Sequence, residues 1–270
     1  MRLSVAFLAV TMVGCTDVGL YAVGAGGAGG PDRAEFQATV CAPVASGEAF
    51  PVKVLFAIEG GSTIDTQLRE EIVNAINDTT TQFANPGMSF SVVTFHTIAS
   101  GLLGRFSADQ IELTPALAKY SAYNEVGPIS MRAPLKLAES IIGGDMQTGC
   151  RGQVARTRYL VVMILVTPDE SCSNSDFNPG IAQECAAIAA TGDFPRCSEC
   201  ELVRTVGALR QLAVQFNAGE VTVQPVLINR GPSDPAPFQA NAIARAGGTE
   251  LLQTNLGAID CRLFPHKAPI

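Results

Sequence analysis

The sequence has no apolar run long enough to cross a membrane, and it contains very little histidine. A membrane-spanning helix needs about 20 consecutive apolar residues, and the longest apolar stretch, residues 3–14, is shorter than that. His96 and His266 are the only histidines among 270 residues, and neither lies beside a recognisable nucleophile motif. Because a Ser-His-Asp or Cys-His set would have to use one of them, we expect both to be packing or surface residues and the protein not to be an enzyme.

Positive charge is also scarce. The chain has 18 lysine and arginine residues against 25 aspartate and glutamate residues, which gives a formal net charge of −7. Proteins that bind nucleic acids depend on clustered positive charge to meet the phosphates. The composition therefore argues against nucleic acid as a partner. With 47% hydrophobic and 16% charged residues, the chain is long enough for one α/β domain with a sizeable core.

The first residues have the pattern of a bacterial export signal. Arg2 precedes a short apolar stretch, which ends in Gly14-Cys15. This junction resembles a lipobox, in which a cysteine after a small residue becomes diacylated and then N-terminal. We predict a lipoprotein signal peptide over residues 1–14 and lipidation of Cys15, with an ordinary signal peptide as the alternative. Thr16 at the next position favours the outer membrane, so we expect a lipid-anchored protein of the bacterial cell envelope.

Residues 15–39 are rich in glycine and have no apolar periodicity, which is typical of a flexible linker. Gly24, Gly26 and Gly29 match the dinucleotide-binding pattern G-x-G-x-x-G. That motif needs a strand before it and a helix after it within one βαβ unit, and no sustained helical pattern follows here. We interpret the segment as a linker that holds the domain off the membrane.

From Cys41 onward, strand-like apolar runs alternate with helical periodicity, which predicts an α/β domain with a doubly wound, mostly parallel sheet and helices on both faces. The almost wholly apolar run from Tyr159 to Val166 is typical of a central strand. The expected strands cover residues 51–58, 88–95, 101–106, 159–166, 221–228 and 250–253. The expected helices cover residues 64–83, 131–142, 201–216 and 238–246.

The loop after the first expected strand resembles a known metal-binding loop. A von Willebrand factor type A domain carries an Asp-x-Ser-x-Ser loop in this position, and the carboxylate and two hydroxyls hold a divalent cation at the carboxyl edge of a parallel sheet. In the matching segment, Glu59 stands at the position of the Asp, Gly61 at the first Ser and Thr63 at the second.

Two further segments and the order of the elements carry the same resemblance. Arg156-Thr157-Arg158-Tyr159 leads into the apolar strand, and Ala244-Arg245-Ala246-Gly247-Gly248 precedes the last strand, as in type A domains of bacterial lipoproteins. The resemblance covers residues 40–262 and leaves residues 263–270 as a C-terminal tail. It implies the type A fold and a binding or adhesion function without catalysis.

The resemblance also implies that the metal site is degenerate. The family's next ligand, a Thr, aligns with Ile129, and its last carboxylate aligns with Pro168. Ser130, Asp169 and Glu170 are the nearest substitutes. The remaining candidate ligands are Glu59, Thr63, Ser130 and Asp169. Because Mg²⁺ dehydrates reluctantly and needs several fixed oxygens, we expect a weakened or lost Mg²⁺ site and no other cofactor.

Helix capping is the alternative explanation for these polar residues. Hydroxyl groups accept backbone N–H bonds at a helix start, and a carboxylate there suits the helix dipole. This explanation applies to Glu59, Ser62, Thr63, Ser130 and Asp169.

Eight cysteines in a chain with an export signal indicate disulfide bonds. Lipidation of Cys15 would leave an odd number. The disulfide candidates are Cys41, Cys172, Cys185, Cys197, Cys200 and Cys261. Because the ends of type A domains can approach each other, the resemblance implies a Cys41–Cys261 disulfide.

The segment Cys197-Ser198-Glu199-Cys200 has the spacing of a redox pair. No strand immediately precedes it, and it lies in a stretch punctuated by proline and glycine, so we interpret it as a structural disulfide in a loop. Zinc coordination is the alternative, although only one cysteine pair has short ligand spacing. That zinc site would use Cys172, Cys185, Cys197 and Cys200.

Three functions remain open from the sequence. The first is a lipid-anchored binding module that presents loops 59–63, 127–131 and 167–172 to a protein or glycan partner. The second is a structural envelope lipoprotein that packs into an assembly and whose adhesion site is inactive. The third is an exported hydrolase or thiol oxidoreductase. Apolar residues facing solvent around the rim of the loops would favour the first function over the second.

Overall fold

The computed structural model describes residues 15–17, 20–21, 35–36, 39–41, 51–62, 64–83, 87–149, 154–173, 180–229, 236–255 and 259. The chain divides into two compact units, residues 1–49 with 267–270, and residues 50–266. In the first unit, β1 (Cys15–Asp17) pairs antiparallel with β4 (Thr39–Cys41), and β2 (Leu20–Tyr21) pairs with β3 (Glu35–Phe36). The stretch expected to be a linker therefore contains short strands.

The second unit is built on a six-stranded sheet with the order β10-β9-β8-β5-β6-β7. Every neighbouring pair is parallel except β6 and β7, which are antiparallel. This topology confirms the prediction of a doubly wound, mostly parallel sheet. The strands are β5 (Val52–Glu59), β6 (Met88–Phe95), β7 (Ala99–Ser107), β8 (Arg158–Leu165), β9 (Glu220–Asn229) and β10 (Leu252–Asn255).

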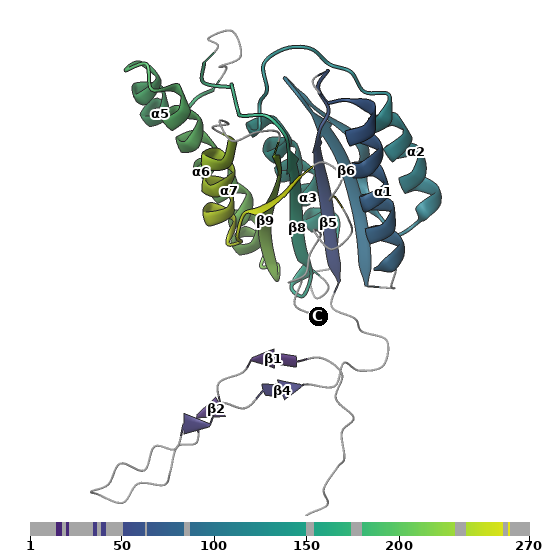
Figure 1. Cartoon of the computed structure of the whole chain (residues 1–270). Helices are drawn as coiled ribbons and strands as arrows, with labels where there is room; N and C mark the ends of the chain where they lie inside the picture. The colour runs from purple at the N-terminus through teal and green to yellow at the C-terminus, as the bar shows by residue number, and fades with distance from the viewer. Residues whose placement is uncertain are drawn as a thin grey trace, which may run out of the picture. The chain divides into compact units, whose positions relative to one another are not determined.

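Helices cover both faces of the sheet (Figure 1). They are α1 (Thr66–Gln82), α2 (Gln110–Ser121), α3 (Arg132–Thr148), α5 (Gln183–Ala189), α6 (Phe194–Gln215) and α7 (Ala236–Gly247). Residues of α1 and α2 pack in one core cluster with one face of the sheet, and residues of α3, α6 and α7 pack with the other face. None of the helices in the described part of the chain is long and apolar enough to cross a membrane.

The central strand β5 shows why the apolar pattern is continuous. Successive side chains of a strand point to opposite faces. Accordingly, Phe56 and Ile58 pack with α1 and α2, while Leu55 and Ala57 pack with α3 and α6. Both faces are buried, so no position in the middle of this strand tolerates a solvent-facing polar residue.

Three helices differ from the expectation. Helix α2, which contains Pro115, was not expected. Helix α6 begins at Phe194 rather than at residue 201, because proline is tolerated in the first helical turn and the Asp193 carboxylate accepts from the Arg196 N–H at 3.2 Å. The Cys197–Cys200 segment, expected in a loop, therefore lies in α6. The short helix α5 was also not expected.

Candidate functional site

The chain reverses its direction of travel across the sheet between β5 and β8. From β5 it proceeds to β6 on one side, and later enters β8 on the other side. In open α/β sheets, ligands bind outside the carboxyl ends of the strands at such a switch point. The segments there, called the carboxyl-edge loops below, are residues 60–62 with 64–65, 96–98, 122–131 and 166–173.

Hydrogen bonds join these loops into one surface, with residues 122–131 at the centre. The Ser62 N–H donates to the Glu125 carbonyl at 2.9 Å, and the Ser130 N–H donates to the His96 carbonyl at 2.8 Å. On the other side, the N–H of Glu170 donates to the Ile129 carbonyl at 2.8 Å. The position of each loop therefore depends on the others.

Glu59 bridges β5 to the end of β8 at the switch point. Its buried Oε2 accepts from the backbone N–H groups of Val166 at 2.7 Å and Thr167 at 3.0 Å, and its Oε1 accepts from Thr167 Oγ1 at 2.6 Å. The expectation that Glu59 caps the following helix is wrong. Asp65 is the residue that caps α1, since its carboxylate accepts from the Leu68 N–H at 2.8 Å.

Asp169 is a buried carboxylate that ties the loop after β8 to the start of α3. Its Oδ1 accepts from the N–H of Met131, the N-cap residue of α3, at 2.7 Å, and its Oδ2 accepts from Ser171 Oγ at 2.5 Å. The Gln239 side-chain amide accepts from the backbone N–H of Asp169 at 2.7 Å and donates to the Asp169 carbonyl at 3.1 Å. Burial raises the pKa of Asp169, while hydrogen bonds from Ser171, Ser198 and the Met131 N–H oppose that shift.

His96 lies where a side chain at residue 61 would lie. A Cβ added to Gly61 would be 2.0 Å from His96 Cδ2 and 2.2 Å from its Nε2. The ring is buried, and its Nδ1 lies 3.4 Å from Thr97 Oγ1. Burial lowers the pKa of His96, although the carboxylates of Glu125 and Glu170 oppose this. The imidazole therefore takes the space of the first hydroxyl in the resembling metal loop.

A buried cation lies beneath the same loop. The guanidinium of Arg69 donates to the carbonyls of Gly61 at 2.8 Å and Ile64 at 3.1 Å, and also to that of Tyr120 at 3.2 Å. Its charge centre lies 5.5 Å from the Tyr120 ring centroid. A fixed positive charge under a loop opposes a second cation bound to that loop. The sequence pattern did not single out Arg69, because it stands beside Leu68 and Ile72 on a helix and looks like an ordinary surface residue.

The other predicted metal ligands are Ser130 and Thr63. Ser130 is half-buried and holds His96 through its backbone, while Thr63 lies outside the described residues. Within the described part of the chain, no group of three or more His, Cys, Asp or Glu side chains is placed to hold a metal ion. Both oxygens of Glu59 and of Asp169 already accept hydrogen bonds, so these residues do not fit the fixed oxygen set that Mg²⁺ requires. Weak or absent Mg²⁺ binding stays a prediction.

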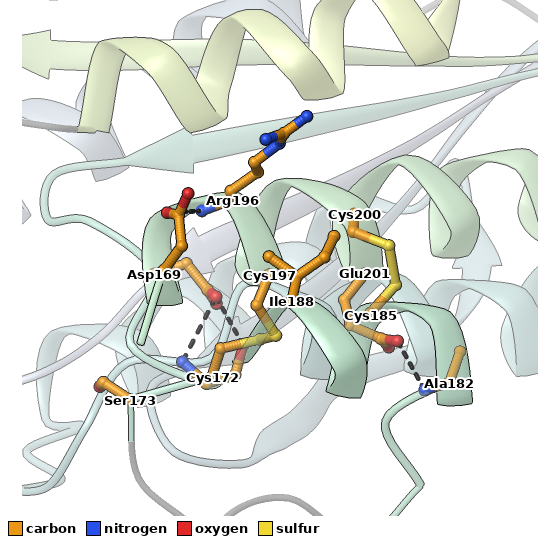
Figure 2. The surroundings of a disulfide bond; sticks show 12 residues. Asp169, Cys172, Ser173, Ala182, Cys185, Ile188, Arg196, Cys197, Cys200 and Glu201 are labelled. Carbon is orange, nitrogen blue, oxygen red and sulfur yellow. Dashed lines mark hydrogen bonds between the residues drawn. A yellow bond between two sulfur atoms is a disulfide. The ribbon is translucent and has the colours of Figure 1, made fainter. Parts of the chain in front are cut away.

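Two disulfides confirm the expectation of disulfide bonding. Cys172 pairs with Cys197 with a Cα–Cα distance of 6.0 Å, and Cys185 pairs with Cys200 with a distance of 5.6 Å (Figure 2). Cys197 and Cys200 therefore do not pair with each other. The zinc alternative is wrong, because all four sulfur atoms are in disulfides and a metal-binding thiolate is not formed.

The remaining cysteine predictions concern the chain ends. Strand pairing in the first unit sets Cys15 opposite Cys41. Cys261 lies outside the described residues. The Cys41–Cys261 disulfide and the lipidation of Cys15 therefore stay predictions.

No protein-family model and no curated protein sequence matches the chain. Among solved structures, the chain is similar to the von Willebrand factor domain of the type V pili tip protein Mfa5 from Porphyromonas gingivalis, with a TM-score of 0.50 and 10% identity over 79% of this chain and 92% of that chain. The domain has the von Willebrand factor type A fold. The VWA domain of SpRpn10 gives a TM-score of 0.49 and 11% identity, covering 79% of this chain and 93% of its own. BatB from Bacteroides thetaiotaomicron gives a TM-score of 0.47 and 12% identity, covering 76% of this chain and 90% of its own.

Proposed function

We propose that the type A domain is a non-catalytic binding module that presents its carboxyl-edge loops to a protein or glycan partner. Two exposed aliphatic side chains on neighbouring loops carry this proposal. Ile98 is 59% exposed and Val126 is 78% exposed. Their loops are joined by the hydrogen bond from Thr97 Oγ1 to the Pro128 carbonyl at 2.9 Å. Apolar side chains held in water on a fixed surface are the usual anchors of a binding interface.

The charge of the same surface favours a partner with basic side chains. The carboxyl-edge loops contain Asp65, Glu125, Asp169 and Glu170 and contain neither lysine nor arginine. Asp65 and Glu170 are exposed and Glu125 is half-buried. Complementary charge speeds association and selects among partners, so binding should weaken as the salt concentration rises.

The absence of catalysis is supported by how the site's polar groups are used. Glu59 and Asp169 accept hydrogen bonds that hold β8 and α3 in place. The His96 imidazole packs on Gly61. Groups committed to holding loops in position are poorly suited to exchanging protons with a substrate.

A structural envelope protein is the second candidate function. The internal hydrogen bonding of Glu59 and Asp169 favours it, because a loop closed by its own carboxylates needs no ligand to be stable. In this case the domain would pack into an assembly, and its exposed aliphatic residues would have no soluble partner.

We also propose that the domain is tethered to the bacterial outer membrane through lipid on Cys15. The single charge at Arg2, the apolar stretch after it and the Gly14-Cys15 junction support this tether. Cys15→Ser should release the protein from the membrane fraction. Intact-mass analysis that finds no lipid on the wild-type protein would exclude the anchor.

Capture of a partner from envelope extract tests the binding function. We expect Val126→Ser to reduce capture of a partner that the wild-type domain retains, both with Mg²⁺ and with EDTA. Val214→Ser is the matched control, because Val214 is 76% exposed near the end of α6, outside the carboxyl-edge loops. Equal capture by the two variants would contradict the proposed surface. Capture of nothing by the wild-type domain would favour the structural alternative.

A further inference from the structure

Cys197 and Cys200 lie one helical turn apart on α6 but belong to different disulfides. Helix geometry sets Cα atoms three residues apart at about 5 Å. Disulfides form between Cα atoms about 4.4–6.8 Å apart. The two cysteines are therefore close enough to pair with each other if either loses its present partner.

The two disulfides share one small apolar cluster. Cys172, Cys185 and Cys197 are buried together, and Cys200 packs against them at the edge of the cluster. Figure 2 shows the two sulfur–sulfur bonds on the same side of α6. A thiol released at Cys200 would therefore stand beside the remaining disulfide rather than in open solvent.

One of these disulfides joins helix α5 to α6. The helix has 7 residues and packs on α6 (Figure 1). Besides the Cys185–Cys200 bond, the Glu201 Oε1 accepts from the Ala182 N–H at 2.7 Å, and Arg204 forms an exposed ion pair with Glu184. Ile188 and Ala189 of α5 also pack against the cysteine cluster. Exposed ion pairs contribute little, and Cys200 itself is partly exposed, so a reagent can approach this disulfide from solvent.

We propose that the Cys185–Cys200 disulfide is a site of thiol–disulfide exchange with a dithiol, and that Cys200 passes the reduction on to the Cys172–Cys197 disulfide. In the first step, the dithiol is oxidised to its disulfide, and its two electrons and two protons reduce Cys185 and Cys200 to thiols. In the second step, the Cys200 thiolate forms a bond with Cys197 Sγ and breaks the Cys172–Cys197 bond. Cys172 leaves as a thiolate and takes up the proton that Cys200 lost.

The exchange would release a carboxyl-edge loop. Cys172 ends the segment that carries Thr167, the partner of Glu59, and Asp169, the partner of Met131. Ser198, next to Cys197 on α6, also bonds Asp169. Once Cys172 is free, this loop loses its covalent link to α6. The reduced protein would then have a looser carboxyl edge, whether or not that edge binds a partner.

Two serine variants that remove the same disulfide test the exchange. Cys185→Ser leaves Cys200 as a permanent internal thiol, whereas Cys200→Ser removes that nucleophile. We expect alkylation by iodoacetamide, mapped by mass spectrometry without reductant, to label Cys172 at least about tenfold more in Cys185→Ser, because an adjacent thiol acts at a high effective concentration. In the same variant, Cys197 and Cys200 should be recovered as one linked peptide.

Equal labelling of Cys172 in the two variants would overturn the proposal. The wild-type protein gives a test that needs no substitution. After treatment with limiting dithiothreitol, the protein that has lost one disulfide should carry alkyl groups on Cys172 and Cys185. If it instead carries them on Cys185 and Cys200, with the Cys172–Cys197 bond intact, the reduction is not passed on and the proposal fails.

Discussion

The imidazole of His96 fills the space that any side chain at Gly61 would need, since a Cβ there would lie 2.0 Å from the ring. The two residues come from adjacent strands, because His96 follows β6 and Gly61 follows β5. A hydroxyl at residue 61, as in the resembling metal loop, requires that His96 also change. The pair thus explains in steric terms why a glycine stands at residue 61 in this domain.

Gly61→Ser should lower the free energy of unfolding by about 1–3 kcal/mol, the usual cost of overpacking a buried site. His96→Ala makes room, so the double variant should cost less than the sum of the single changes. Urea unfolding measures all three. Gly207→Ala in α6 is the control, because a Cβ there meets no atom within 4 Å. An additive double variant would show that the two residues do not compete for space.

Glu59→Ala should cost about 3 kcal/mol, because it leaves the buried N–H groups of Val166 and Thr167 without an acceptor. From the sequence alone, Glu59 would be expected to contribute only about 1 kcal/mol, as a helix cap does. Asp65→Ala is the matched comparison, since Asp65 is the cap of α1. Thermal or urea unfolding of the two variants should rank Glu59→Ala as the less stable, and the reverse order would contradict the bridging role.

Millimolar Mg²⁺ or Mn²⁺ should leave the melting temperature essentially unchanged. An ion that binds the folded state alone raises the melting temperature with the logarithm of its concentration over Kd. The hydrogen-bonded carboxylates of Glu59 and Asp169, together with the cation of Arg69, oppose such binding. Differential scanning fluorimetry with and without EDTA measures the effect. A rise of several degrees that Glu59→Ala abolishes would restore a working metal site.

Acidification should destabilise the protein through His96. Burial lowers its pKa below the ordinary value of 6.5. The unfolded chain therefore binds the proton more readily, so the stability from neutral His96 is present above pH 6.5 and is lost as the pH falls through that value toward the folded-state pKa. His96→Gln should flatten this part of the curve of unfolding free energy against pH. An unchanged slope in the variant would assign the acid sensitivity to other groups.

The Cys41–Cys261 disulfide predicted from the resemblance can be tested by peptide mapping without reduction. Closing so long a loop stabilises the folded state by several kcal/mol in the chain-entropy model. We expect one linked peptide pair that contains both cysteines. Recovery of Cys41 linked to Cys15, its opposite residue in the β1–β4 pair, would refute both this bond and the lipid anchor.

The apolar strands show which parts of the fold can be predicted from local sequence pattern. Residues of β5 and β8 are apolar at nearly every position, and both strands are covered on both faces. Because burial on two faces demands apolar residues whatever the neighbours are, the pattern predicted these strands and the parallel sheet. The helices were predicted separately, from apolar residues that recur at helical period.

The helices that were missed or shortened show where local pattern fails. Pro115 breaks the helical pattern of α2, yet Leu117 and Tyr120 of that helix are fully or almost fully buried against the sheet. The burial of these side chains outweighs an unfavourable local residue. In α6, Pro195 stands in the first turn, where its missing N–H costs nothing. Both helices are decided by packing and position rather than by propensity.

The sequence by itself determined the class of fold, the strand that precedes Glu59 and four of the cysteines that form disulfides. Only the tertiary structure decided that Glu59 meets Val166, 107 residues away, and that Cys197 pairs with Cys172 rather than with Cys200. The periodic spacing of apolar residues predicts which residues are buried, because burial depends largely on a residue's own side chain. This spacing does not predict which distant residue a buried side chain will contact, because that depends on how strands and helices pack together.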